Sequence, residues 1–132
     1  MQRVLLHRKP TLSNPPTTKY RDLTQTVSAS LASLRAGTPE VMKSFSELGR
    51  HATSEGALDR KTKELIALAL GVAARCDPCI AFHMQTLVKL GVTRQELEET
   101  LGVVTYMGGG PSLMYAASAV AAFQEFSQAE GR

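Results

Sequence analysis

Two cysteines and a histidine lie within eight residues of one another near the middle of the chain. Cys76 and Cys79, the only cysteines, enclose the dipeptide Asp-Pro, and His83 follows four residues later. Thiols three residues apart can cycle between a dithiol and a disulfide, and an imidazole one helical turn further on can accept or return the thiol proton. The pattern therefore predicts thiol redox chemistry.

Pro78 indicates the local geometry of the pair. A proline disfavours the α conformation for the residue before it and suits the first position of a helix, so Asp77 is predicted to be the N-cap. Cys79 would then lie in the first helical turn, where the positive end of the helix dipole lowers the pKa of its thiol. Cys76 would lie just outside the helix, close enough for a disulfide. The charge of Asp77 opposes the thiolate, and we expect the helix terminus and His83 to outweigh it.

Two other uses of the cysteine pair remain open. A zinc ion could be held by Cys76, Cys79, His83 and a distant carboxylate, because a tetrahedral zinc site needs only three or four such ligands. The pair could also be inert, since Cys-x-x-Cys is a short motif with many chance matches. A structural disulfide is disfavoured, because it would close a very short loop and the chain shows no sign of export.

A long apolar helix, expected from Asp59 to Arg75, leads into the motif and carries Glu64 twelve residues before the first cysteine. With this context the chain resembles the alkylhydroperoxidase D-like branch of the carboxymuconolactone decarboxylase superfamily. Three features support the resemblance: the position of Glu64, the run from Cys76 to His83, and the segment 107–111 before a final Ala-rich helix. The resemblance covers roughly residues 39–127, and it favours the redox branch because the decarboxylase branch lacks this cysteine pair.

The resemblance implies an all-α, single-domain bundle of about six helices that assembles into homotrimers or homohexamers. It also implies a peroxidase or disulfide reductase in which Cys79 attacks, Cys76 resolves, and Glu64 and His83 relay protons, with no cofactor or metal. The expected substrate is a hydroperoxide or a disulfide, and the expected reductant is a dithiol on a lipoyl or thioredoxin-like protein. The alternative function is a non-catalytic zinc-binding or redox-sensing helical oligomer.

Spacing alone does not bring Glu64 to the site. If the two helices simply doubled back at Cys76, Glu64 would lie level with residues near 88, about one and a half turns from His83. Contact requires steeply crossed helices or a different bend. The alternative is a solvated charge near the first turn of its helix, where carboxylates are favoured.

Length and composition fit one compact domain. The 132 residues include 43% hydrophobic residues, no tryptophan and seven Phe and Tyr, so the core must be aliphatic and Ala-rich. The net charge of +3 is misleading, because residues 1–21 hold five basic and no acidic side chains and leave ten basic and twelve acidic ones elsewhere. The helical part therefore does not favour a nucleic-acid surface.

The N-terminal segment is predicted to be a tail. Residues 1–19 contain three prolines and many Ser, Thr and Asn, which predicts a disordered basic tail before a helical domain at 20–132. The apolar run at positions 4–6 is too short for a signal peptide, and no later stretch is apolar enough to span a membrane. The expected location is the cytoplasm.

Helical signals follow one another through the rest of the chain. Apolar residues repeat at helical spacing over 23–34, and Thr38 with Pro39 predicts the capped start of a second helix. This second helix should carry a buried apolar stripe, formed by Val41, Phe45 and Leu48. The polar segment 49–56 predicts a loop.

Further signals mark the second half of the chain. Gly91 fits the C-cap of the cysteine helix, and Thr93 opens a capping box before a helix with Leu97 and Leu101 turned inward. The segment Gly108–Pro111 predicts a turn before a last helix at 112–128. A phosphate-binding loop is disfavoured there, because no strand precedes it and no lysine follows.

Overall fold

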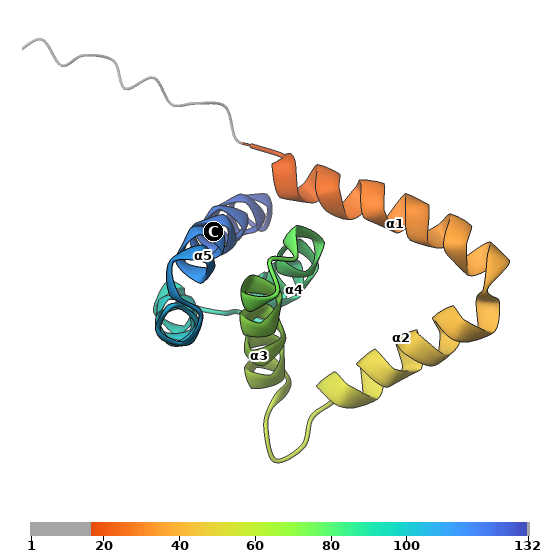
Figure 1. The fold of residues 1–132 in the computed structure, drawn as a ribbon, viewed down its shortest axis with the longest axis horizontal. Coiled ribbons are helices and arrows are strands. Elements are labelled where there is room, and N and C mark those ends of the chain that lie inside the picture. The colour runs from red at the N-terminus through yellow and green to blue at the C-terminus, as the bar shows by residue number, and fades with distance from the viewer. Residues whose placement is uncertain (1–16, 132) are drawn as a thin grey trace, which may run out of the picture.

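The computed structural model describes residues 17–131, which form five α-helices and no strand (Figure 1). The helices are α1 (Lys19–Gly37), α2 (Pro39–Thr53), α3 (Arg60–Ala73), α4 (Asp77–Lys89) and α5 (Arg94–Ala129). The all-α prediction is therefore confirmed over this range. Of the predicted tail, residues 1–16 lie outside the described residues, and α1 begins at Lys19. No helix within 17–131 combines the length and the apolar character needed to cross a membrane.

The core lies between α3, α4 and α5, which all pack against one another. Alanines on one face of α5 are buried, and their small side chains let the helices approach closely. The predicted inward positions Leu97 and Leu101 are confirmed, with exposed fractions of 0% and 6%. The largest fully buried side chains are Leu68, Ile80, Met84, Leu87, Leu97, Val72 and Val88. The core is thus aliphatic, as the composition predicts.

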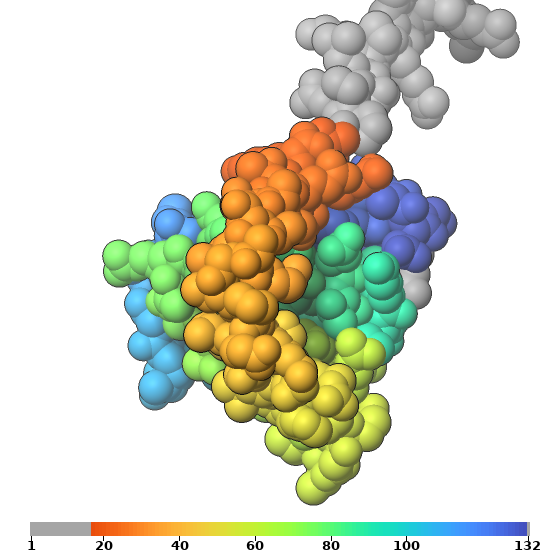
Figure 2. Space-filling view, turned by 90° about the vertical axis from the view of Figure 1, so that its right-hand side faces the viewer, coloured from red at the N-terminus to blue at the C-terminus, as the bar shows by residue number. Residues whose placement is uncertain are grey.

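The first two helices form a bent arm beside this core. α1 contacts α4 and α5, whereas α2 contacts only its chain neighbours α1 and α3. Figure 2 shows α1 and α2 as one continuous band, orange to yellow, across the near face of the molecule. No residue of α2 is buried. The arm therefore receives little cover from its own chain.

The predicted buried stripe of α2 is not buried in the chain. Val41, Phe45 and Leu48 have exposed fractions of 67%, 71% and 63%. Their spacing predicts the amphipathic helix itself, which forms over Pro39–Thr53. The spacing does not indicate what covers the apolar face. Within the described residues, no other element buries it. The prediction of burial was therefore wrong for the single chain.

Side chains cap the starts of α3 and α5, and the cap at Thr93 confirms a prediction from the sequence. The Asp59 carboxylate accepts a hydrogen bond from the backbone N–H of Thr62 at 2.7 Å. The Thr93 hydroxyl accepts one from the backbone N–H of Glu96 at 3.1 Å. Thr38 also occupies an N-cap position, but its side chain does not accept a hydrogen bond from α2. Side-chain caps thus fix the starts of α3 and α5.

One predicted helix boundary differs in the structure, and another is present as a kink. The expected loop at 49–56 is shorter, because α2 continues to Thr53. The predicted break at Gly108–Pro111 is confirmed as a kink inside α5, where Gly109 has a non-helical conformation (φ 73°, ψ −158°) between two helical parts. A single glycine at positive φ bends the helix, and the backbone resumes helical geometry at once. The helices of residues 17–131 therefore number five when the two parts of α5 are counted as one, and the six that were expected count these parts separately.

An ion pair joins the starts of α3 and α5. Lys61 Nζ lies 2.9 Å from Glu96 Oε2. The hydrogen bond to Lys61 lowers the pKa of the Glu96 carboxyl and raises that of the Lys61 ammonium. About one third of each side chain is open to solvent, so the contribution of the pair to stability is small.

A buried carboxylate attaches α1 to the core. Glu125 of α5 accepts hydrogen bonds from the backbone N–H groups of Tyr20, at 3.2 Å, and of Arg21, at 2.7 Å. These groups belong to the first turn of α1, whose N–H groups have no partner within the helix. The N-cap residue of α1 makes no side-chain cap. Glu125 therefore caps α1 from another helix.

We expect Glu125→Ala to lower the free energy of unfolding by about 1–3 kcal/mol, because it leaves buried amide donors without an acceptor. Urea unfolding measures the loss, and hydrogen exchange should show faster exchange at the Tyr20 and Arg21 amides. Gln124→Ala, at the exposed neighbouring position, is the control. Equal stability of the two variants would contradict the capping role.

Candidate thiol redox site

A tight turn connects α3 to α4 and leads directly into the cysteine pair. Arg75 has a positive φ of 57°, the left-handed conformation that commonly ends a helix. The Cys76 N–H donates to the Gly71 carbonyl at 3.0 Å, and the Arg75 N–H donates to the Val72 carbonyl at 3.1 Å. These two bonds form a Schellman motif, which closes α3 and reverses the chain at once. Cys76 is thereby placed at the beginning of α4.

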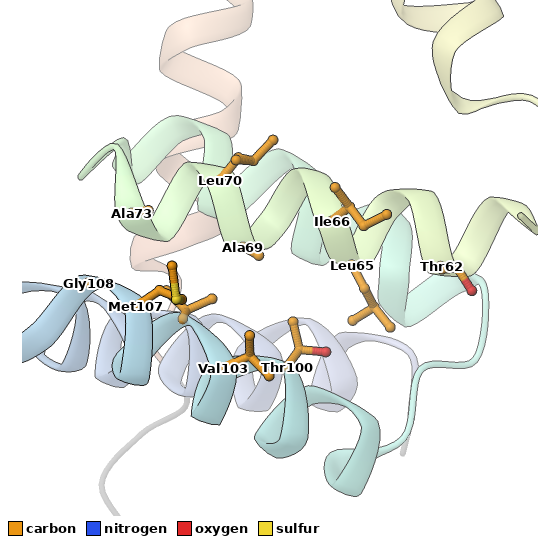
Figure 3. A pocket seen from close by; sticks show the side chains of 11 residues that line it. Thr62, Leu65, Ile66, Ala69, Leu70, Ala73, Thr100, Val103, Met107 and Gly108 are labelled. Carbon is orange, nitrogen blue, oxygen red and sulfur yellow. The ribbon is translucent and has the colours of Figure 1, made fainter.

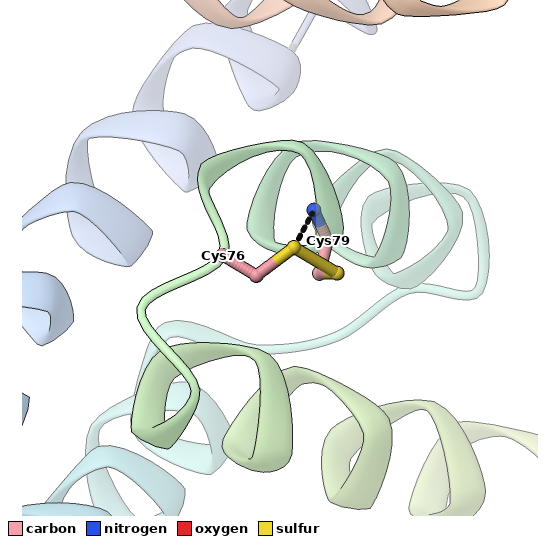
Figure 4. Close-up of a disulfide and its surroundings, with 2 residues drawn as sticks. All are labelled: Cys76 and Cys79. Atoms are coloured by element: carbon pink, nitrogen blue, oxygen red, sulfur yellow. Dashed lines mark hydrogen bonds between the residues drawn. A yellow bond between two sulfur atoms is a disulfide. The ribbon is translucent and has the colours of Figure 1, made fainter.

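Cys76 and Cys79 form a disulfide at the first turn of α4 (Figure 4). Their Cα atoms are 5.3 Å apart, and both residues are half-buried. Cys76 is the N-cap, and its Sγ accepts a hydrogen bond from the Cys79 backbone N–H at 3.3 Å. The prediction of Asp77 as N-cap was therefore wrong by one residue, since Asp77 is already helical. The cysteine sulfur takes the place of the usual oxygen acceptor at the helix start.

Gly71 allows α3 to approach the second cysteine closely. A Cβ atom added at Gly71 would lie 3.0 Å from the Cβ of Cys79, which is tighter than an ordinary contact. The two helices therefore cross where one has no side chain. Sequence reasoning did not assign a role to this glycine. A lone glycine inside an apolar helix is a signal of close packing, but it does not name the partner.

The crossing also brings Glu64 to His83. Glu64 Oε2 lies 2.7 Å from His83 Nδ1. The Glu64 side chain is 6% exposed and that of His83 is 34% exposed, so the carboxylate is buried and the imidazole reaches solvent. If Glu64 is ionised, the hydrogen lies at Nδ1 between the two groups, and Nε2 is left for another partner. The alternative of a solvated Glu64 is thus excluded by the structure.

All four residues named from the sequence lie on the α3–α4 pair. Cys79 and His83 are one turn apart on α4, a spacing that places side chains on the same face. Glu64 approaches from α3 and Cys76 from the turn between the helices. The arrangement places a disulfide, an imidazole and a buried carboxylate in one part of the molecule. Chemically, it can store two electrons and move a proton.

A metal centre finds no support in the same region. Within residues 17–131, no three His, Cys, Asp or Glu side chains are grouped so that they could hold a metal ion. The zinc site that the sequence left open would need at least three of these side chains to face one point. In the structure both sulfurs are bonded to each other.

Comparison with known proteins gives the family. The sequence profile of the carboxymuconolactone decarboxylase family matches residues 39–122. The chain belongs to this family. Among curated proteins, an uncharacterized protein of Cupriavidus necator is 36% identical over 107 residues, which cover 81% of this chain and 95% of that protein.

Two solved structures of carboxymuconolactone decarboxylase family proteins share the fold. One, apo-lpg0406 from Legionella pneumophila, has 58% identity and a TM-score of 0.82, with 84% of this chain and 99% of that chain covered. The other, from Thermotoga maritima, has 28% identity and a TM-score of 0.74, with 82% and 92% covered. An involvement in antioxidative response has been suggested for the Thermotoga protein. The family fold and the disulfide of the present chain are compatible with such a role.

The Gly71 contact gives a testable prediction for this family member. Alanine favours a helix over glycine by about 0.5–1 kcal/mol, and Gly102→Ala should gain this amount because its added methyl meets no atom. Gly71→Ala must instead push α3 away from Cys79, at a cost of about 1–3 kcal/mol. Urea unfolding of the oxidised protein should therefore rank Gly71→Ala below the parent and Gly102→Ala above it. Equal stability of the two variants would show that the crossing tolerates a side chain.

Proposed function

We propose that this protein is a thiol-dependent peroxidase or disulfide reductase that uses Cys76 and Cys79 as its redox pair. The observation that carries the proposal is the disulfide at the start of α4 on the helix pair that also holds the Glu64–His83 hydrogen bond. An inert cysteine pair would need neither a buried carboxylate nor an imidazole nearby. Burying a carboxylate costs free energy unless it has a partner, so the pairing indicates a function for both groups.

The peroxidase cycle would begin with both cysteines reduced. The Cys79 thiolate attacks one oxygen of the hydroperoxide, an S–O bond forms, the O–O bond breaks, and the alkoxide leaves with a proton as the alcohol. The Cys76 thiolate then attacks the sulfenic acid sulfur of Cys79, the S–O bond breaks, and the hydroxide leaves as water after it takes one proton. The product is the disulfide that the structure contains. The substrate gains the two electrons that the two thiols lose.

In the same proposal, His83 moves the protons and Glu64 holds the ring in place. The imidazole lies one turn after Cys79, so it can take the thiol proton before attack and return it to the leaving oxygen. The Glu64 carboxylate fixes the ring orientation through Nδ1 at 2.7 Å. It also stabilises the positive charge that the ring acquires while it holds the proton.

The cycle would be completed by a dithiol reductant. One thiolate of the reductant attacks the disulfide to give a mixed disulfide, and its second thiol releases the protein as a dithiol. Both cysteines are half-buried, which leaves access for a dithiol of the lipoyl or thioredoxin class. If the acceptor is a small disulfide and not a hydroperoxide, the reduced protein attacks it by the same thiol–disulfide exchange, and the small disulfide is released as two thiols. We propose a cytoplasmic location, because a compartment rich in dithiols keeps such a pair reducible.

Stoichiometric oxidation of the reduced protein tests the proposal. Reduced protein, freed of reductant, should consume one equivalent of a hydroperoxide and lose two free thiols per chain, or release two thiols from a small disulfide. A dithiol should then restore both thiols. The control is protein whose cysteines have been alkylated. If the reduced and the alkylated protein consume equal amounts of hydroperoxide and release equal amounts of thiol from the small disulfide, the proposal is wrong. It is also wrong if protein purified without chelator retains one zinc ion per chain.

A further inference from the structure

Arg75 follows α3 in a backbone conformation that glycine usually adopts. Its φ is 57°, and among residues 17–131 it is the one residue other than glycine with a positive φ. At positive φ the Cβ atom of an L-amino acid crowds the neighbouring backbone, whereas glycine has no Cβ atom. The arginine therefore costs the turn some stability that a glycine would retain. A costly conformation directly before Cys76 indicates that the arginine side chain itself has a use.

The same chain uses glycine where its other helices end in this conformation. The two backbone hydrogen bonds that close α4 have the same spacing as those of Arg75 and Cys76, and Gly91, with a φ of 80°, takes the position of Arg75. Gly131, which follows α5, has a φ of 74°. The chain thus places glycine after α4 and after α5, and places arginine beside the cysteine pair.

The Arg75 side chain makes no contact with a carboxylate that would explain its place in the turn. It is exposed, and none of the three ion pairs within residues 17–131 includes it. One structural explanation remains, because the dipole of α3 favours a cation at the C-terminal end of that helix. This effect acts on the stability of the protein and not on its choice of ligand. A measurement of ligand preference therefore separates the two explanations.

Charged residues flank Cys76 on both sides in the chain. Asp77 has helical dihedrals in the first turn of α4, where the dipole favours a carboxylate, so local structure explains its position. Arg75 precedes Cys76 directly in the turn that leads into the disulfide (Figure 4). Since consecutive Cα atoms are about 3.8 Å apart, its charge acts on a ligand at the disulfide. The other titratable groups of the site, Glu64 and His83, are hydrogen-bonded to each other. Arg75 is therefore the positive charge that this site offers to an anionic ligand.

A large apolar groove elsewhere on α3 offers no such charge. It lies between α3 and the first half of α5, and its volume is about 500 Å³ (Figure 3). Its lining is almost entirely aliphatic and includes neither cysteine nor any charged side chain. A groove of this kind disfavours a carboxylate, because burial of an unpaired charge is costly. A charged ligand of the disulfide is therefore recognised at the turn between α3 and α4.

We propose that Arg75 selects a dithiol reductant that carries a carboxylate near its sulfur atoms. This inference rests on the proposed function, and it concerns the reductant because the structure holds the oxidised pair, which is the form that a reductant meets. The guanidinium has paired N–H donors whose geometry matches a carboxylate. In the exchange the dithiol loses two electrons and two protons and becomes a disulfide, while the protein disulfide gains them and becomes two thiols. Arg75 binds the carboxylate and takes no part in the transfer.

Dihydrolipoate and dihydrolipoamide test the proposal, because they carry the same dithiol and differ by one carboxylate. The readout is the ratio of their second-order rate constants for reduction of the oxidised protein, in which effects common to both reductants cancel. We expect Arg75→Gln to lower this ratio by about 3-fold or more, as loss of an exposed ion pair does, and Arg75→Lys to lower it less. Lys89→Gln removes the same charge at the other end of α4 and should leave the ratio unchanged. In about 1 M salt the parent should lose its preference.

Two further variants separate the charge from the backbone. Arg75→Gly suits the positive φ of the turn, so it should fold and should lose the preference as fully as Arg75→Gln does. Asp77→Asn removes the opposing charge and should raise the ratio. Equal ratios for the parent and Arg75→Gln, or a loss in Arg75→Gly that Arg75→Gln does not share, would overturn the proposal. If neither dithiol reduces the disulfide of the parent, the proposed function fails and this inference fails with it.

Discussion

Replacing Cys79 with serine is expected to abolish turnover of hydroperoxide, with a loss of more than about 10³-fold, because a serine hydroxyl does not ionise as a thiol does. Cys76→Ser should behave differently. Cys79 can still attack one equivalent of peroxide, but its sulfenic acid has no neighbouring thiol to expel water. Stopped-flow measurement of peroxide consumption, with a dithiol as reductant, distinguishes the two variants. Cys79→Ser should consume no peroxide, whereas Cys76→Ser should consume one equivalent and then stop.

The stalled intermediate provides the decisive observation for this pair of variants. A reagent that traps sulfenic acids should label Cys79 in the Cys76→Ser protein and should label nothing in the Cys79→Ser protein. Labelling of Cys76 in the Cys79→Ser protein would reverse the roles of the two sulfurs. Equal turnover by the parent and both variants would end the peroxidase proposal.

The sequence predicts the local features of this protein well, because they depend on residues close together in the chain. Asp59 and Thr93 each accept a hydrogen bond from an amide three residues later, so their cap positions are visible in the sequence. Gly91, which the sequence predicts as a C-cap, follows the C-cap residue Leu90 and has the positive φ of 80° that is typical of this next position. The sequence predicts the N-cap of α4 one residue too late, because sulfur is not among the usual cap acceptors and the cap residue is Cys76.

The contact between Glu64 and His83 could not be predicted from spacing. It depends on how α3 and α4 cross, and the crossing depends on Gly71 and on the left-handed Arg75. Arginine rarely adopts that conformation, so the turn gives no clear sequence signal. Only the resemblance to a family nominates Glu64. The apolar stripe of α2 shows a second limit of prediction from sequence. Its spacing predicts an apolar helix face but does not indicate what covers that face.

The Glu64→Gln variant is expected to lower turnover by about 10²-fold or more while the fold is retained, because proton transfer by a positioned group typically contributes that much. Glutamine has the size of glutamate, and its carbonyl can still accept a hydrogen bond from Nδ1 of His83. It cannot stabilise a positive charge on the ring, however. Glu99→Gln, which changes an exposed carboxylate of α5, is the matched control and should leave turnover unchanged.

A double-mutant cycle distinguishes a relay from two separate contributions. If Glu64 acts only through the imidazole, Glu64→Gln should cost nothing further once His83→Gln has removed the ring. The free-energy coupling between the two positions would then equal the whole effect of Glu64→Gln on kcat/KM. Additive losses would show that Glu64 acts on the thiols by another route. Unfolding in urea, measured on the same four proteins, separates loss of proton transfer from loss of the buried hydrogen bond, because only the latter lowers stability.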